Sequence, residues 1–228
     1  MQSALTLPRS WWTRGRPYTL AEMIADGVVH GIGLLVAVAL GSTLLAIGGF
    51  ETAPQEFPAL LVYVVSLLVA LSASLAFNLC PIFSPAKRAL ARLDQAAIFL
   101  FIAGTYTPFL AMIGGTPAGL LLTILVWGAA LVGIALKLIV PHRFGRGALV
   151  LYLGIGWSGV LVFQTIGTVL PPTTLWLVVA GGLTYSAGLV FHLWEKLHFQ
   201  NALWHSFVVI GASLHLWAIF DLMVLRRL

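Results

Sequence analysis

Apolar residues fall into seven long runs along this chain, and each run is long enough to cross a lipid bilayer. A membrane-spanning helix needs about 20 consecutive, mostly apolar residues. Short segments that contain proline, glycine or glutamate separate the runs, for example at 51–58, 81–85 and 114–117. The pattern therefore predicts an all-α integral membrane protein whose helices cover about 21–49, 59–80, 92–113, 117–140, 147–169, 173–195 and 202–225.

Composition favours a membrane protein over a soluble one. The 228 residues are 60% hydrophobic and only 8% charged, with a mean hydropathy of +1.02, whereas soluble domains are about 25% charged. The net charge of +5 comes from scattered basic residues without a contiguous basic face, so nucleic acid is not an expected partner. The single cysteine, Cys80, excludes an internal disulfide. We expect one transmembrane domain over 1–228, in which 1–20 form an interfacial N-terminal segment.

Lysine and arginine residues indicate which helix ends face the cytoplasm, because cytoplasmic loops are enriched in them. They occur before the first predicted helix and around the second, fourth and sixth connections, whereas the first, third and fifth connections have none. The N-terminus is therefore predicted in the cytoplasm and, with seven spans, the C-terminus outside. Arg226 and Arg227, next to the C-terminus, are the exception to this alternation.

Ionisable side chains inside the predicted helices are costly in lipid, so each needs a partner or a function. Glu22, Asp26 and His30 follow one another at intervals of four residues, which places them on one helical face. This face can line the bundle interior as a polar stripe. It can also serve only interhelical hydrogen bonding, with Glu22 interacting favourably with the helix dipole. His215 lies near the predicted middle of the membrane, where a neutral histidine between helices is the simplest interpretation.

Small polar residues from three helices are predicted at one membrane level, near the cytoplasmic ends. Asp94 lies at the start of the predicted third helix, where it can also serve only as a helix cap. The shared depth of these residues indicates a site. Its members are Ser74, Asn78, Asp94, Asn201 and His205.

Three segments carry a resemblance to a known family. They are 22–33 (EMIADGVVHGIG), 93–109 (LDQAAIFLFIAGTYTPF) and 202–219 (ALWHSFVVIGASLHLWAI). From about residue 18 to residue 220, the chain resembles the hemolysin III family of bacterial membrane proteins, which is related to progestin and adipoQ receptors and to alkaline ceramidases. The resemblance implies a protein of the bacterial inner membrane, in contact with membrane lipid, with hydrolytic chemistry on a lipid-like molecule.

The family pattern also implies a zinc site. One histidine ends the second helix, two more form a His-x-x-x-His motif that opens the seventh, and an aspartate on the third holds or activates a zinc-bound water. Ser74, Asp94 and His205 match this pattern, whereas Asn78 and Asn201 stand where it has histidines. Asparagine is a poor zinc ligand, because zinc sites in proteins are built from His, Cys, Asp and Glu.

This departure leaves three outcomes open. The residues can form a neutral hydrogen-bonded network without metal, or they can bind a harder cation through their oxygen atoms. The third outcome is that a different set of residues holds zinc. The candidates are His205 and Asp94 together with His198 or His192, or with Asp26 and His30. His198 joins the helical face of His205 only if the seventh helix begins that early.

These observations predict a metal-dependent hydrolase of a lipid-like amide or ester, with a zinc site that is divergent or lost. Asp94 would be the general base, His205 the remaining metal ligand, and Ser74 an oxyanion-stabilising or ligand-orienting group. One alternative is a non-enzymatic lipid-sensing or receptor-like protein on the same scaffold. The other is a proton or ion pathway through the intramembrane polar residues Glu22, Asp26, His30, Asp94 and His215.

Overall fold

The computed structural model describes residues 18–81, 83–141 and 145–228, and this part of the chain is helical without any strand. Seven segments are long and apolar enough to span a membrane, which confirms the predicted seven-helix architecture. The fifth of these segments, Gly147–Val169, combines several elements. In chain order, the elements are α1 (Leu20–Glu51), α2 (Phe57–Leu79), α3 (Lys87–Ile113), α4 (Pro117–Ile139), α5 (Gly145–Gly156), η2 (Ser158–Val162), α6 (Phe163–Val169), α7 (Pro172–Leu193), α8 (Gln200–Phe220) and η3 (Asp221–Leu225).

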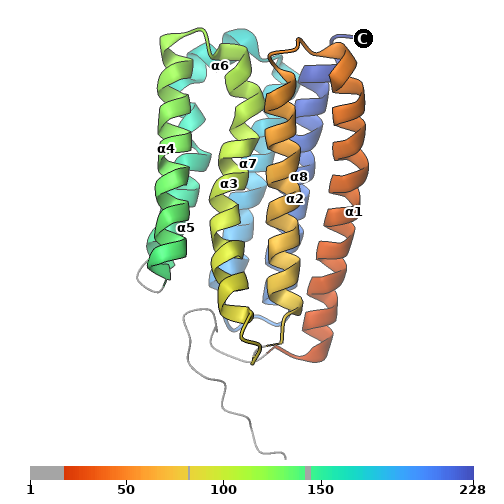
Figure 1. Ribbon diagram of the computed structural model, residues 1–228, viewed down its shortest axis with the longest axis vertical. Helices are drawn as coiled ribbons and strands as arrows, with labels where there is room; N and C mark the ends of the chain where they lie inside the picture. Colours follow the sequence, from red (N-terminus) through yellow and green to blue (C-terminus); the bar gives the residue numbers. More distant parts are fainter. Residues whose placement is uncertain (1–17, 82, 142–144) are drawn as a thin grey trace, which may run out of the picture.

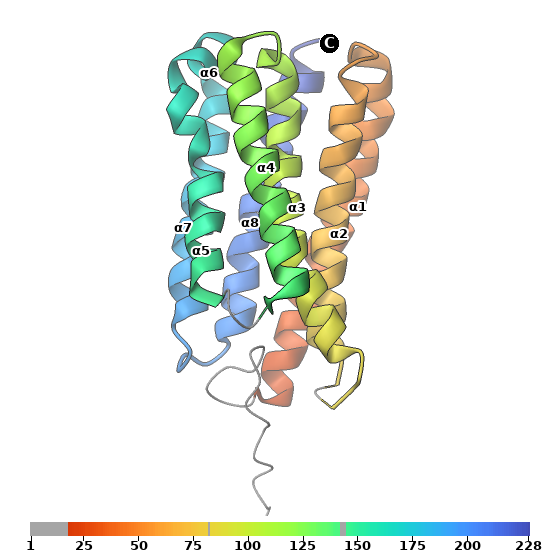
Figure 2. The ribbon, with the colours of Figure 1, turned by 60° about the vertical axis from the view of Figure 1, so that its left-hand side comes forward.

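The helices lie side by side along the long axis of the molecule (Figure 1). Helix α8 packs against both α1 and α7, while α2 packs against α1 and α3. Helix α1 begins at the lower end of the bundle in Figures 1 and 2, and the chain ends at the upper end. We call the lower end, where α1 and α8 begin and α2 meets α3, the site end.

The outer surface of the bundle carries large apolar side chains, as expected for contact with lipid. Leu35, Ile124, Leu131 and Trp176 are examples, each more than half exposed. Inside, small residues let the helices approach closely, which is typical of membrane bundles. A Cβ atom on Gly104 of α3, for example, would lie 2.0 Å from the hydroxyl of Ser66 on α2.

Helix α3 begins at Lys87, five residues before the expected start. Asp94 therefore lies two turns inside the helix, and the interpretation of Asp94 as a helix cap is wrong. Lys87 explains the earlier start, because its ammonium group donates hydrogen bonds to the carbonyl groups of Phe77 and Cys80. These bonds cap the end of α2 and draw the first turn of α3 against it.

The fifth span is not the continuous helix that the sequence predicts. After Gly156 the chain forms the 3₁₀ turn η2 before α6 continues. The hydroxyl of Tyr106 on α3 donates to the carbonyl of Gly156 over 2.6 Å and accepts from the amide of Gly159 over 3.0 Å. Glycine has low helix propensity, and a side chain from another helix satisfies backbone groups that the break leaves free.

Candidate functional site

Seven polar side chains from four helices meet at the site end. We call this group the site cluster. Its members are Asp26 and His30 of α1, Ser74 and Asn78 of α2, Asp94 of α3, and Asn201 and His205 of α8. Two of its members, Asp26 and His30, are almost fully buried. The structure thus joins the α1 stripe to the residues predicted at one membrane level, the combination that one of the alternative metal sets in the sequence analysis contained.

Asp26 is bonded to residues on α1 and α8. Its carboxylate oxygen Oδ1 lies 2.6 Å from Nδ1 of His205, and its other oxygen accepts a hydrogen bond from the Asn201 amide over 3.2 Å. Its backbone carbonyl lies 2.8 Å from Nδ1 of His30. Because carbonyl and carboxylate oxygens accept hydrogen bonds, these contacts assign the proton of each histidine to Nδ1.

This proton placement determines the state of the opposite ring nitrogens. A neutral imidazole has one N–H and one lone pair, so Nε2 of both His30 and His205 presents a lone pair. These atoms lie 3.0 Å and 3.5 Å from the hydroxyl oxygen of Ser74. The carboxyl group of Asp94 also interacts with that hydroxyl. With both imidazoles neutral and Asp94 ionised, three acceptors therefore surround one hydroxyl, which has a single proton to donate.

A cation between the imidazoles would relieve this surplus of acceptors. Ligand atoms of Asp26, His30 and His205 all lie within 4.8 Å of one another, and the two imidazole ring centres are 4.2 Å apart. Metal-binding histidines usually donate their second ring N–H to a carboxylate or a backbone carbonyl. Asp26 provides both acceptors here, so both rings have the orientation and tautomer of metal ligands.

The two asparagines link the cluster through hydrogen bonds. The amide of Asn201 donates to Oδ1 of Asn78 over 2.9 Å as well as to Asp26. The amide of Asn78 in turn donates to the backbone carbonyl of Ser74 over 2.9 Å. Since the Asn78 side-chain oxygen already accepts a hydrogen bond, these residues support Asp26 and Ser74 in the described arrangement.

Glu22 lies outside the site cluster and forms hydrogen bonds at the start of α1. Its carboxylate accepts from the backbone amide of Thr19, which forms a capping box at the start of α1. The same carboxylate accepts from the amide of Phe199 over 2.8 Å. Glu22 therefore fixes the connection before α8 against α1, which holds His205 opposite Asp26.

The remaining candidate histidines lie away from the cluster. Helix α8 begins at Gln200, because Phe199 adopts a left-handed conformation with φ of 57°. The condition under which His198 would share the helical face of His205, an earlier start of this helix, is therefore not met. The His192 ring packs against Trp204 at 4.8 Å between ring centres. His215 lies farther along α8, where its ring is hydrogen-bonded to the Val178 carbonyl of α7.

Gln200 is a buried residue of this region that sequence reasoning missed. Its side chain accepts a hydrogen bond from the hydroxyl of Tyr18 over 3.0 Å and donates to the carbonyl of His192 over 2.6 Å. It therefore joins the ends of α1 and α7 to the start of α8. A glutamine at the first position of a helix is common on exposed surfaces, so the sequence offered no signal for this role.

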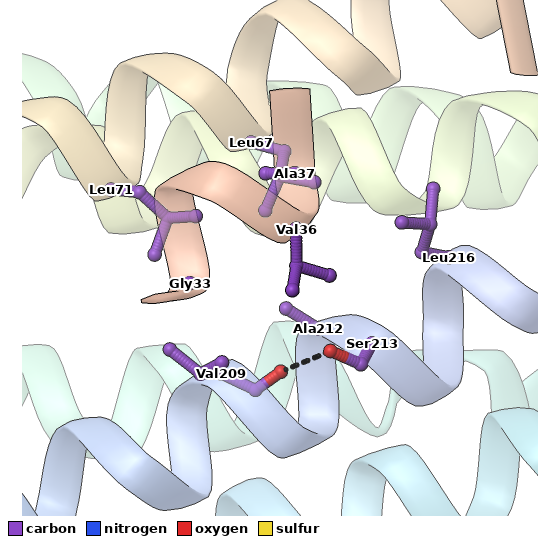
Figure 3. Close-up of a pocket in the computed structure, with 9 residues that line it drawn as sticks. All are labelled: Gly33, Val36, Ala37, Leu67, Leu71, Val209, Ala212, Ser213 and Leu216. Atoms are coloured by element: carbon purple, nitrogen blue, oxygen red, sulfur yellow. Dashed lines mark hydrogen bonds between the residues drawn. The ribbon is translucent and has the colours of Figure 1, made fainter. Parts of the chain in front are cut away.

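A narrow apolar cavity of about 10 Å³ lies one turn farther into the bundle (Figure 3). Gly33 and Val209 are among its lining residues and follow His30 and His205 by about one helical turn. Its single polar side chain, Ser213, donates a hydrogen bond to the Val209 carbonyl (Figure 3). The site cluster is therefore bordered by apolar packing on its membrane-core side.

The sequence of this chain is similar to those of known proteins. The family profile described as Haemolysin-III related matches residues 19–216. The chain belongs to the haemolysin III family. It is 33% identical over 198 residues to a hemolysin-3 homolog of Bacillus subtilis, a match that covers 86% of this chain and 92% of that protein. It is 34% identical over 195 residues to hemolysin-3 of Bacillus cereus, covering 85% and 88%.

The haemolysin III relationship extends to more distant proteins. The human monocyte to macrophage differentiation factor is 29% identical over 128 residues, which covers 56% of this chain and 52% of that protein. The family and its membrane-spanning helices are thus established. Neither the matched names nor the family description specifies the chemistry of the site cluster.

Proposed function

We propose that this haemolysin III protein is a metal-dependent hydrolase that cleaves an amide or ester bond of a lipid-like molecule within the membrane. One observation carries the proposal. The Nε2 atoms of His30 and His205 converge on the Ser74 hydroxyl, which Asp94 also approaches, while Asp26 holds both Nδ1–H groups. This arrangement favours a bound cation over a purely neutral network, because it has more acceptors than protons.

The donor set fits a divalent metal, although it differs from the family pattern. Asn78 and Asn201 are unsuited to zinc, and their amide groups bond to each other and to Asp26. Nε2 of His30 and Nε2 of His205 would hold the ion instead, and the carboxyl group of Asp94 would act beside it as the general base. Imidazole nitrogens are common ligands of catalytic zinc sites, which keep a position open for water or substrate. Asp26 would orient both rings.

A divalent ion bound there supplies Lewis-acid activation of water or of a carbonyl oxygen. The chain's own residues provide the other requirements of hydrolysis. The carboxylate of Asp94 accepts a proton from the attacking water and returns it to the leaving nitrogen or oxygen. The hydroxyl of Ser74 donates a hydrogen bond to the developing oxyanion. Water and the amide or ester are consumed, and a carboxylic acid and an amine or alcohol are formed.

The surroundings of the site support a lipid-like substrate. A shallow groove of about 380 Å³ on the outer surface is lined only by α1 residues and Leu79 of α2. Gly27 of this groove directly follows Asp26 in the chain, and Met23, Ile24 and Val28 are exposed. An acyl chain in this groove would bring a polar head group to the helix ends that carry the cluster. In this proposal those helix ends face the cytoplasm, as the distribution of lysine and arginine predicts, and the membrane is a bacterial inner membrane, as the family resemblance implies.

Metal content and hydrolysis test the proposal together. Protein purified without added chelator is expected to contain about one equivalent of zinc or another divalent ion, measured by inductively coupled plasma mass spectrometry. It is also expected to hydrolyse fluorogenic N-acyl amides or acyl esters in nanodiscs. His30→Gln and His205→Gln should each remove both properties. His192→Gln, whose ring packs on Trp204 outside the cluster, is the matched control and should retain them.

A non-enzymatic lipid-sensing protein is the second candidate function. The Asn78–Asn201–Asp26 hydrogen bonds favour it, because they connect α1, α2 and α8 without an ion. Stable protein with saturable lipid binding, without stoichiometric metal and without hydrolysis, would support this candidate and reject the hydrolase.

A further inference from the structure

Three polar side chains lie far from the site cluster, in the middle of the bundle. They are Tyr63 of α2, Tyr185 of α7 and His215 of α8, and we call them the mid-bundle trio. His215 follows His205 by ten residues, which corresponds to a rise of about 15 Å along α8. Tyr63 lies eleven residues from Ser74 along α2, which corresponds to about 17 Å. The trio is therefore separate from the proposed metal site.

Glycines in α7 and α8 leave room for two of these rings. The rings of Tyr185 and His215 meet edge to face, with 5.4 Å between centres. A Cβ atom on Gly181 of α7 would lie 2.3 Å from the His215 ring, and one on Gly211 of α8 would lie 2.9 Å from the Tyr185 ring. Glycine inside a helix costs about 1 kcal/mol relative to alanine. Both helices thus carry an unfavourable residue where the other helix inserts a polar ring.

Tyr63 is the third member of the trio. Its side chain is fully buried in the apolar core, against which Tyr185 also packs. The two tyrosine hydroxyls are close enough to interact electrostatically. The Phe101 ring lies beside Tyr63, with 6.4 Å between centres. Three helices therefore deliver polar groups into surroundings that are otherwise apolar.

Each member of the trio has one polar atom without a hydrogen-bond partner among the described residues. His215 donates its Nε2 proton to the carbonyl of Val178 over 3.0 Å, so Nδ1 carries a lone pair. That nitrogen and the hydroxyls of Tyr63 and Tyr185 are buried and unpartnered within the described ranges. Unsatisfied polar groups at membrane depth are strongly unfavourable, because no bulk water reaches them.

We propose that the mid-bundle trio is an intramembrane binding site for an O–H group. Such a group donates a hydrogen bond to Nδ1 of His215 and accepts one from the hydroxyl of one tyrosine. The hydroxyl of the other tyrosine then forms a hydrogen bond either with the first tyrosine or with the bound oxygen. An O–H group combines these two roles in one small atom pair. Its two sources are a buried water molecule and the hydroxyl of an alcohol dissolved in the membrane, and both use the same contacts.

The proposal predicts the effect of deleting each hydroxyl while keeping the ring. Tyr63→Phe and Tyr185→Phe should each lower the midpoint of thermal unfolding in nanodiscs by about 2–4 °C, the usual shift for loss of one satisfied hydrogen bond in a chain of this size. The double variant should lose less than the sum, because both hydroxyls serve one bound group. Tyr152→Phe, which removes a hydroxyl bonded to the Gln95 carbonyl over 2.8 Å, is the reference for a satisfied tyrosine. An unchanged or raised midpoint for both single variants would overturn the proposal, since removing an unsatisfied hydroxyl is neutral or stabilising.

A second measurement does not depend on how the variants fold. In the unaltered protein with ¹⁵N-labelled histidine, solid-state NMR should show His215 as the Nε2–H tautomer, with an Nδ1 shift typical of a hydrogen-bonded acceptor. The shift of a free acceptor would contradict a bound O–H group.

Addition of 1-dodecanol to delipidated protein distinguishes the two sources of the O–H group, water and a membrane-dissolved alcohol. Saturable thermal stabilisation that His215→Leu abolishes identifies an alcohol site, whereas a hydrogen-bonded Nδ1 without a dodecanol response identifies water.

Discussion

Nδ1 of His205 lies 2.6 Å from Oδ1 of Asp26, although 179 positions separate the two residues in the chain. This contact joins the first turns of α1 to the first turns of α8. It also fixes the tautomer of His205, because the proton lies between Nδ1 and the carboxylate and leaves Nε2 free to bind a cation. The Asp26 backbone carbonyl has the same effect on His30.

Asp26→Asn should weaken zinc binding about 10–100-fold, the usual cost of losing a residue that orients metal ligands. An amide can still accept a hydrogen bond, but it lacks the negative charge that makes the imidazole a stronger donor to the metal. Calorimetric titration of metal-free protein with Zn²⁺ measures the affinity. Ser42→Ala on the lipid-facing side of α1, where the hydroxyl bonds only to its own helix, should leave it unchanged. Equal affinity in Asp26→Asn and the parent protein would refute the orienting role.

Restoring the family's histidines should tighten metal binding. In Asn78→His combined with Asn201→His, imidazoles would replace two amides that lie 2.9 Å apart and beside Asp26. Zinc retained after dialysis against a chelator should therefore rise relative to the parent protein. Asn78→Ala alone should retain the parent's metal content, since His30 and His205 would be the imidazole ligands. A double variant with no additional zinc would show that these two positions do not correspond to the family's histidines.

Much of the fold could be predicted from the sequence, because hydrophobic segment length is a direct physical requirement of the bilayer. The break in the fifth span could not. It depends on Tyr106, which is 50 residues away from Gly156 and reaches its carbonyl only in the folded bundle. The earlier start of α3 likewise depends on the contact of Lys87 with the end of α2.

The candidate site was only partly predictable for a similar reason. Periodicity places Asp26 and His30 on one face of α1, and shared depth groups Asp94 with His205. Neither signal specifies which helices are neighbours, so the contact of α1 with α8 and the pairing of Asp26 with His205 required the structure. The exclusion of His198 depended on the backbone conformation of Phe199, which no spacing rule indicates.

Tyr106→Phe should destabilise the broken fifth span. The substitution removes one donor to Gly156 and one acceptor for the Gly159 amide, and such losses cost about 1–3 kcal/mol when the remaining group stays buried. Scanning fluorimetry should show a lower unfolding midpoint, and hydrogen exchange should increase at 156–162. Phe163→Leu, at an exposed apolar position beside the break, is the control and should change neither. Unchanged exchange in Tyr106→Phe would mean that the tyrosine does not hold the break.

The ion pair between Glu56 and Arg227 should make stability depend on pH at the end opposite the site. The guanidinium donates two hydrogen bonds to the carboxylate, and this holds the pKa of Glu56 below its ordinary value. A carboxyl group with a lowered folded-state pKa contributes stability above its unfolded-state pKa, and this contribution is lost as pH falls through the folded-state value. Glu56→Gln should therefore reduce the loss of thermal stability on acidification.

The matched control for this pH experiment is Glu51→Gln. Glu51 lies at the end of α1, on the same side of the bundle, and has no ion-pair partner within the described ranges. Its substitution should leave the acid dependence of the unfolding midpoint close to that of the parent protein. Identical pH profiles for Glu56→Gln and the parent would show that the ion pair with Arg227 contributes no measurable stability.

The single cysteine tests the predicted orientation without any engineered residue. Cys80 follows α2 at the site end and is partly exposed, and the nearby Lys87 and Arg88 predict that this end is cytoplasmic. A membrane-impermeant maleimide should therefore label Cys80 in inverted inner-membrane vesicles but not in intact spheroplasts, and Cys80→Ser should abolish the labelling. Labelling from the outside would place the N-terminus of α1 and the site cluster on the external face. The proposed hydrolase would then release its polar product outside the cell, so this experiment also determines which compartment supplies water and metal to the site.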